Sequence, residues 1–316
     1  MNVGAVRVDP VLDGRILSRL HGTKPFPEVG SPLWDDLAGM VHEDGMVEST
    51  VGAFLVRTAD RVVLVDAGSG QAFPGGYRPP PMDVDDPADP FTVMMRANGV
   101  GDDDARRIAS DFGRIKAEQG GLPASLAELG VAPEDVTDVV ATHLHYDHIG
   151  WVSDGGRPFF PNATVRCAAA DLDHFLAGPA DELFTSFLFR ALPAAERLAP
   201  VLDHIETWAA DGPIAPGIDV RLAPGHTPGS SVVVLSDGDQ RALLLGDMVH
   251  CPLELQDEDF NLLVDHDQDM ANRVREAYAR ELEGTDVLVS AAHFPGLRFG
   301  RLLPGEATRR WTFEAA

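Results

Sequence analysis

The stretch THLHYDHIGW, residues 142–151, places three histidines and an aspartate directly after an apolar, strand-like run. His143 and His145 are two residues apart, so in an extended backbone they project to the same side, and Asp147 and His148 follow in a tight turn. Desolvating four such groups together would cost several kcal/mol, which direct coordination of a divalent metal would offset. A histidine-rich surface loop is the alternative, but this density of ligand-type side chains favours a metal site.

Three further apolar runs are each followed by a His or Asp that could bind a metal ion. They are APGHTPGS (223–230) with His226, LLLGDMVH (243–250) with Asp247, and VLVSAAHFPG (287–296) with His293. One such residue is more often a satisfied polar group than a ligand. Four strand ends that agree in one chain favour a single shared site.

The surrounding pattern predicts an α/β layered domain. Apolar runs rich in β-branched residues predict strands, and helix-like spacing bordered by Pro and Gly predicts helices between some of them. The predicted strands are VRVDPVL (6–12), TVGAFLVRT (50–58), RVVLVDAG (61–68), VTDVVATHL (136–144), ATVRCAA (163–169), IDVRLAPG (218–225), SVVVLSD (231–237), RALLLGDMV (241–249) and TDVLVSAAH (285–293); the predicted helices are 103–118, 122–129, 169–178, 181–191 and 268–283.

Composition limits the partners. The 316 residues include 50 acidic and 25 basic ones, a formal charge of -25, which argues against nucleic acid because phosphate binding needs clustered Lys and Arg. We expect a neutral or cationic small-molecule substrate. The chain has neither a leader-like N-terminus nor an apolar run near the roughly 20 residues of a membrane span. With only Cys167 and Cys251, it is expected in the reducing cytoplasm.

Residues 70–101 differ from the rest, because they contain the Pro- and Asp-rich run GGYRPPPMDVDDPADP (75–90). We interpret them as an excursion over the surface of a single domain that spans residues 1–316. Long loops of this kind serve as lids or as homodimer contacts, or have no role. FTVMMRANGV (91–100), inside it, would either cap a substrate or pack as ordinary core.

The ordered set of THLHYDHIG, APGHTPGS, LLLGDMVH and SAAHFPG resembles the metallo-β-lactamase superfamily, whose HxHxDH motif is followed by a His, an Asp and a last His. VVLVDAG (62–68) resembles the early strand motif of that family. The resemblance implies an αββα sandwich, in which two mixed β-sheets are flanked by helices, with the first half ending near residue 205.

The same resemblance implies two metal ions. One would be held by His143, His145 and His226, the other by Asp147, His148 and His293, and Asp247 would bridge them. Asp66 would either orient the ligand loops or simply cap the turn at its strand end. Imidazole and carboxylate donors without thiolate suit two Zn²⁺, although iron, manganese and cobalt fit the same donors.

Paired ions of this kind, roughly 3.5 to 4 Å apart, share a water, lower its pKa and polarise the substrate oxygen. Asp147 is then the natural proton acceptor, and later the proton donor to the leaving group.

Several stretches outside the ligand motifs, less specific than those motifs, resemble the branch of the superfamily that contains methyl parathion hydrolase and its lactonase relatives. They are VGAFLVRTADRVVLVDAG (51–68), FPNATV (160–165), GDMVH (246–250), the helix after HDQDMANRVREA (266–277), HFPGLRFGRLL (293–303) and WTF (311–313). The chain departs from the acyl-homoserine lactonases at one position. Where they place a Tyr that polarises the lactone carbonyl, it has His250, either a hydrogen-bond donor to the developing oxyanion or a packed core residue.

These observations predict a dinuclear metal-dependent hydrolase of a neutral small molecule, first of all a lactone or ester, with an organophosphate triester as a further candidate. The alternative is a thioester hydrolase of the glyoxalase II type, which needs basic residues for the glutathione carboxylates. A β-lactamase, a nuclease and a non-catalytic metal-binding protein rank lower.

Overall fold

The first half of the chain builds a mixed sheet. The computed structural model describes residues 1–71, 76–97 and 100–314. Strands run in the order β1-β2-β3-β4-β6-β9-β10, antiparallel from β1 to β4 and parallel from β4 to β10, with β5 antiparallel to β2. Their bounds are β1 Asn2–Val3, β2 Val6–Ser18, β3 Val47–Arg57, β4 Val62–Val65, β5 Lys116–Glu118, β6 Asp138–Val140, β9 Thr164–Ala168 and β10 Ile205–Trp208.

The second half builds a seven-stranded sheet in sequential order. All neighbouring strands are antiparallel except β14 and β15. The strands are β11 Gly212–Ala215, β12 Ile218–Leu222, β13 Ser231–Asp237, β14 Gln240–Leu244, β15 Leu288–Ser290, β16 Gly300–Leu303 and β17 Arg310–Phe313. The chain passes from the first sheet to the second between Trp208 and Gly212, close to residue 205, where the first half was predicted to end. A small hairpin, β7 Ser153–Asp154 and β8 Arg157–Pro158, stands apart from both sheets.

Alternation along the strands builds three apolar layers. In β3, Phe54 and Val56 face the second sheet, whereas Ala53 and Leu55 face the helices on the outer side. Because both faces of the central strands are buried, these strands appear in the sequence as continuous apolar runs. The second sheet repeats this arrangement, with alternate residues of β13 and β14 packed against α10.

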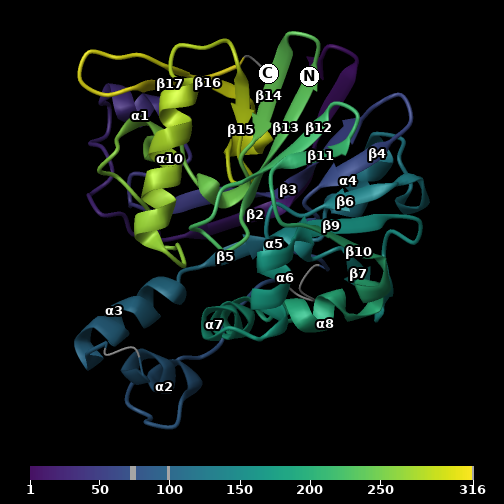
Figure 1. Ribbon diagram of the computed structural model, residues 1–316. Coiled ribbons are helices and arrows are strands. Elements are labelled where there is room, and N and C mark those ends of the chain that lie inside the picture. Colours follow the sequence, from purple (N-terminus) through teal and green to yellow (C-terminus); the bar gives the residue numbers. More distant parts are fainter. Residues whose placement is uncertain (72–75, 98–99, 315–316) are drawn as a thin grey trace.

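Helices cover the outer faces of both sheets (Figure 1). Side chains of α4, α6 and α8 pack on the first sheet, and those of α10 pack on the second. The helices are α1 Pro32–Asp36, α2 Pro90–Ala97, α3 Asp102–Phe112, α4 Leu122–Glu128, α5 Tyr146–Ile149, α6 Ala169–Leu176, α7 Ala180–Phe189, α8 Ala194–Leu198, α9 Leu253–Gln256 and α10 Gln268–Leu282. None of the helices in the described parts of the chain is both long and apolar enough to cross a membrane. The predicted αββα sandwich is confirmed.

Each predicted strand is present, and one helix prediction is wrong at its end. The helix predicted over residues 103–118 stops at Phe112, because Gly113 caps it, and Lys116–Glu118 pairs with β2 instead. Strands β1, β7, β8, β10, β11, β16 and β17 were not predicted either. Each has only two to four residues, too few for a strand pattern to stand out in the sequence.

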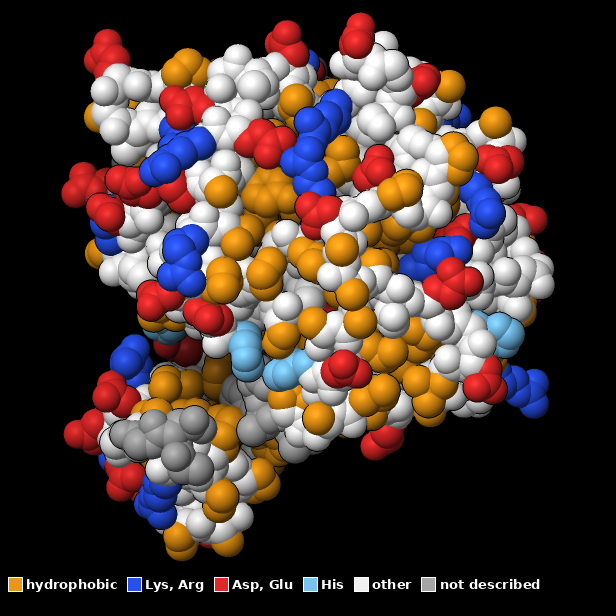
Figure 2. All heavy atoms as spheres, viewed as in Figure 1, with side chains coloured by type: hydrophobic (Ala, Val, Ile, Leu, Met, Phe, Trp, Pro, Cys, Tyr) orange, Lys and Arg blue, Asp and Glu red, His pale blue; other side chains and the backbone are white. Residues whose placement is uncertain are grey.

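The excursion at residues 70–101 contains a helix that was not expected, α2; residues 72–75 and 98–99 lie outside this description. Phe91 and Met95 are buried against Ala105 and Phe112, which supports the core-packing interpretation of FTVMMRANGV. Helices α2 and α3 form a lobe that stands out from the body of the molecule (Figures 1 and 2).

Two loops meet closely beneath the histidine-rich segment. The Gly150 N–H donates to the Gly68 carbonyl at 2.7 Å, and the Trp151 N–H donates to the Ala67 carbonyl at 2.9 Å. A Cβ on Gly150 would lie 2.0 Å from the carbonyl carbon of Ser69. Only glycine fits between these two backbones.

We therefore expect Gly150→Ala to lower the free energy of unfolding by about 1 to 3 kcal/mol, the usual cost of overpacking. Gly212→Ala is the matched control, because nothing lies within 4 Å of its added Cβ. It should change stability by no more than about 0.5 kcal/mol. Urea unfolding followed by circular dichroism measures both, and equal stability of the two variants would contradict the proposed steric conflict.

Candidate metal centre

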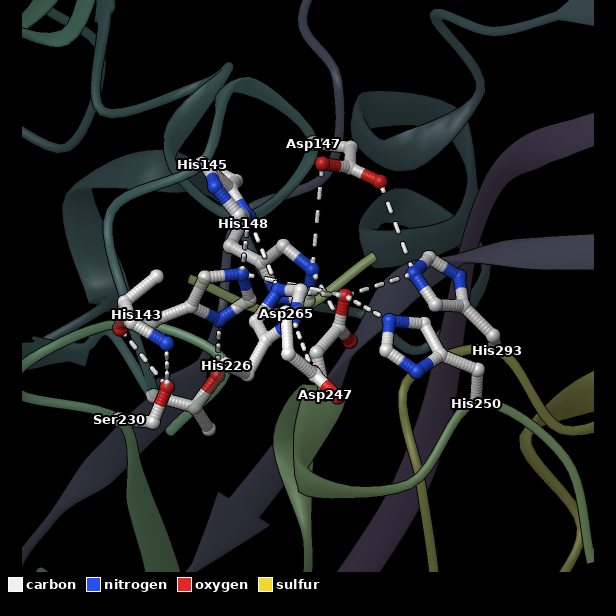
Figure 3. A network of polar contacts seen from close by, with 12 residues as sticks. His143, His145, Asp147, His148, His226, Ser230, Asp247, His250, Asp265 and His293 are labelled. Atoms are coloured by element: carbon white, nitrogen blue, oxygen red, sulfur yellow. Dashed lines mark hydrogen bonds and ion pairs between the residues drawn. The ribbon is translucent and has the colours of Figure 1, made fainter. Parts of the chain in front are cut away.

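Loops at one edge of both sheets deliver the predicted residues to one place (Figure 3). His143 and His145 follow β6, and Asp147 and His148 lie on α5. The second sheet contributes the loop between β12 and β13, a 3₁₀ turn at Gly246–Met248 after β14, and the segment after β15; these carry His226, Asp247 and His293.

Three imidazoles converge on one point. His143 Nε2 lies 2.9 Å from His145 Nδ1, and His226 Nε2 lies 3.0 Å from the same atom. Together these residues form a group that could hold a metal ion. Three ring nitrogens at such distances cannot all be satisfied by hydrogen bonds to one another, because each nitrogen provides either one proton or one lone pair.

A second group combines Asp147, His148 and His293. The Asp147 carboxylate lies 3.7 Å from His293 Nε2 and 3.9 Å from His148 Nε2. Asp247 lies between the two groups: its oxygens are 3.0 Å from His293 Nε2, 3.3 Å from His148 Nε2 and 3.6 Å from His226 Nε2. This is the position that a bridging carboxylate would occupy.

The buried polar atoms fit a pair of metal ions. His148 Nε2 and Asp247 Oδ1 are buried without a hydrogen-bond partner among the described residues. Burial, together with the neighbouring imidazoles, lowers the pKa of His143 and of His145 well below the ordinary value, which keeps both in the neutral form that binds metals. Burial raises the pKa of Asp247, but His148, His293 and His250 outweigh it and hold the value well below the usual range.

Asp66 lies directly behind His148. Its carboxylate is 2.9 Å from His148 Nδ1 and accepts hydrogen bonds from the Thr142 N–H and hydroxyl at 2.8 and 3.0 Å. The backbone of Asp66 has φ 64°, a left-handed conformation that costs a non-glycine residue energy. Of the two predicted roles, orienting the histidine loop is the one that these contacts support.

His250 lies inside the cluster, 3.4 Å from Asp247 through Nε2 and with its ring stacked on that of His293. It also forms a possible ligand group with His226 and Asp247, which sequence reasoning did not foresee. Burial lowers the pKa of His250, but Asp247 and Glu254 outweigh it and raise the value to about 10.

A pocket of about 210 Å³ opens above the cluster. Tyr146, between His145 and Asp147 in the sequence, lines this pocket and stacks on Phe189, with the ring centroids 4.9 Å apart. The other residues of the lining, besides members of the cluster, are Ile16, Ser18, Leu20, Ser49, Thr185 and Val264. Among the described residues no Lys or Arg lines it.

Apart from Asp66, sequence reasoning missed the buried carboxylates that hold the ligand loops. Asp171, on α6, accepts hydrogen bonds from the Gly229 N–H at 2.6 Å and the Thr227 hydroxyl at 2.9 Å, and so fixes the loop that carries His226. The only signal in the sequence is that Asp171 lies in the first turn of a helix that begins with apolar residues, on the side that the fold buries. Burial raises the pKa of Asp171 to about 6.

Because the pKa of Asp171 rises from 3.8 in the unfolded chain to about 6 in the fold, the folded protein binds the proton more tightly. This contribution to stability is present below about pH 4 and is lost as the pH rises through about 6. In metal-free protein, we expect the free energy of unfolding of the wild type to fall by on the order of 3 kcal/mol relative to that of Asp171→Asn between about pH 4 and pH 6. Urea unfolding at several pH values measures this difference. Parallel pH profiles would contradict the assignment.

Comparisons with known proteins give matches to a family model, to curated relatives and to solved structures. The family model described as Metallo-beta-lactamase superfamily matches residues 49–293. The probable metallo-hydrolase Rv2300c of Mycobacterium tuberculosis is 24% identical over 259 residues, which cover 77% of this chain and 74% of that protein.

Two solved structures share the fold over nearly the whole chain. AidC, described as a dizinc quorum-quenching lactonase in complex with the product N-hexnoyl-L-homoserine, has a TM-score of 0.72 at 21% identity and covers 100% of this chain and 97% of its own. The hydrolase AbOPH, described as in the beta lactamase superfamily, has a TM-score of 0.70 at 20% identity and covers 98% and 95%. The family match spans every predicted ligand position, and the chain therefore belongs to the metallo-beta-lactamase superfamily, as a metal-dependent hydrolase.

Proposed function

We propose that the protein is a dinuclear zinc hydrolase that opens a lactone or cleaves an ester of a neutral small molecule. The observation that carries the proposal is the convergence of two ligand groups on one carboxylate, Asp247, at the floor of a pocket. His143, His145 and His226 would hold one ion, and Asp147, His148 and His293 the other. The lactonase description of AidC supports the substrate class.

A bound metal pair supplies Lewis acidity at the substrate oxygen and a water of lowered pKa. The residues of the chain would do the rest. Asp147, at the mouth of the cluster, accepts a proton from the attacking water and returns it to the leaving oxygen. His250 Nε2, beside Asp247, donates a hydrogen bond to the oxyanion that forms at the carbonyl.

The walls of the pocket favour a neutral substrate. Ile16, Leu20, Phe189 and Val264 provide apolar surface, and Ser18 and Ser49 add small polar groups. Glutathione carries two carboxylates, which would meet Asp147 and Asp247 without a Lys or Arg among the described lining residues to balance them. The pocket therefore supports a lactone or ester over a glutathione thioester.

The first test combines metal analysis with a substrate panel of γ- and δ-lactones, aryl esters, a phosphotriester and a glutathione thioester. We expect close to two zinc ions per chain. Turnover should be highest on a lactone or ester, abolished by chelation and restored by zinc. Fewer than one metal per chain, or no metal-dependent turnover on any member of the panel, would refute the proposal. A preference for the glutathione thioester would favour the glyoxalase-type alternative.

The second test replaces His250 by Phe, which keeps the ring but removes both N–H groups. Loss of one oxyanion donor should lower kcat on the best substrate about 10²- to 10³-fold while the zinc content stays at the wild-type level. His204→Phe, the same change at an exposed site outside the cluster, is the matched control. Unchanged turnover in His250→Phe would show that His250 is only a packed residue, and loss of zinc would instead identify it as a ligand.

A further inference from the structure

Arg275, on α10, is the largest fully buried side chain of the described chain, with 1% of its surface exposed. Its Nε donates to the Met248 carbonyl at 2.6 Å, one residue after Asp247. Its Nη2 lies 2.8 Å from Asp265 and 3.5 Å from Glu254, and both of these carboxylates are fully buried. A buried guanidinium is costly unless charges and hydrogen bonds compensate it, so this arrangement demands an explanation.

The Asp265 end of the network reaches the first ligand group. Asp265 Oδ1 lies 3.2 Å from His226 Nδ1, while His226 Nε2 points at His145 (Figure 3). A carboxylate that accepts the Nδ1 proton fixes the tautomer in which the Nε2 lone pair is free for a metal. Arg275 in turn holds this carboxylate through Nη2.

The Glu254 end reaches His250. Glu254, on α9, accepts hydrogen bonds from the backbone N–H groups of His250 at 2.7 Å, Cys251 at 3.3 Å and Leu262 at 3.1 Å. The same carboxylate lies 3.5 Å from His250 Nδ1. It therefore fixes the backbone that carries His250 and leaves the opposite nitrogen, Nε2, facing Asp247.

We propose that Arg275 is a positioning residue that braces the metal centre from behind. One guanidinium fixes His226 through Asp265, fixes His250 through Glu254, and holds the Asp247 turn through the Met248 carbonyl. This inference rests on the proposed function only in that His226 and Asp247 are taken as ligands and His250 as an oxyanion donor. It gives a physical role to α10, which begins within the stretch HDQDMANRVREA (266–277).

Substitutions of Asp265 and of Glu254 should impair different properties, zinc affinity in the first case and turnover in the second. Asp265→Asn keeps the shape but removes the charge behind His226, so zinc affinity should fall about 10- to 100-fold, the usual effect of removing such a partner. Glu254→Gln should keep wild-type zinc affinity and lower kcat on the best substrate, with KM little changed. Arg275→Met should show both losses, and Arg275→Lys, which keeps the charge, should restore part of each.

Zinc affinity is measured by competition with a chromophoric chelator in the absence of substrate, and thermal unfolding of metal-free protein is recorded for every variant. Arg309→Met is the matched control. The guanidinium of Arg309 pairs with Glu276 of α10, the helix that carries Arg275, at 2.8 Å and with Glu283 at 2.9 Å, outside the metal cluster. We expect this variant to lose thermal stability without losing zinc affinity.

Each outcome decides the inference. Wild-type zinc affinity in both Asp265→Asn and Arg275→Met would overturn it, and so would an equal loss in Arg309→Met, which would indicate general loosening of α10. If Arg275→Met does not fold, Asp265→Asn and Arg275→Lys decide alone. Zinc binding by the wild type without turnover of any substrate refutes only the proposed function; absence of zinc binding by the wild type refutes both.

Discussion

The structure depends on one constraint: imidazole nitrogens and carboxylate oxygens from four separate segments must meet within a few ångströms at the edge of two sheets. These atoms cannot satisfy one another, since His145 Nδ1 alone faces two other ring nitrogens at 2.9 and 3.0 Å. Burying them is unfavourable unless something compensates their lone pairs and charge. The fold around them serves to hold groups together that would otherwise separate.

Buried acids do most of this holding. Asp66 ties His148 to the end of β4, and Asp171 ties the His226 loop to α6. Asp13 accepts hydrogen bonds from Trp151 and from the Ser69 N–H, so it joins the two loops that meet at Gly150. Each carboxylate replaces water for backbone groups that a loop would leave unpaired. Much of the acidity of the chain lies on its surface, but these few residues are structural.

The residue pattern predicted an α/β layered domain and a shared site at four strand ends, because both depend on local patterns. The αββα sandwich and the division of the ligands between two ions came from the family resemblance. Alternating burial over two apolar faces makes β3, β4, β13 and β14 visible as continuous runs. Apart from Asp66, the residues that support the ligands could not be predicted. Glu254, Asp265 and Arg275 are ordinary charged residues in sequence, and only the packing of α10 against the loops shows that they are buried together. Helix α2 was missed because the prolines around it read as loop, whereas burial of Phe91 stabilises it.

The change of sheet between Trp208 and Gly212 divides the centre between the two halves of the chain. Each proposed ion would take two donors from the loops of the first sheet and, with the bridging Asp247 counted, two from those of the second. Metal binding would then cross-link the two layers, between which an apolar cluster is packed. Such a cross-link couples metal affinity to the packing of the two sheets against each other, because a ligand that binds only the assembled state stabilises that state. Loss of metal would therefore be felt first as a loosening between the two halves of the sandwich, even where each sheet stays intact.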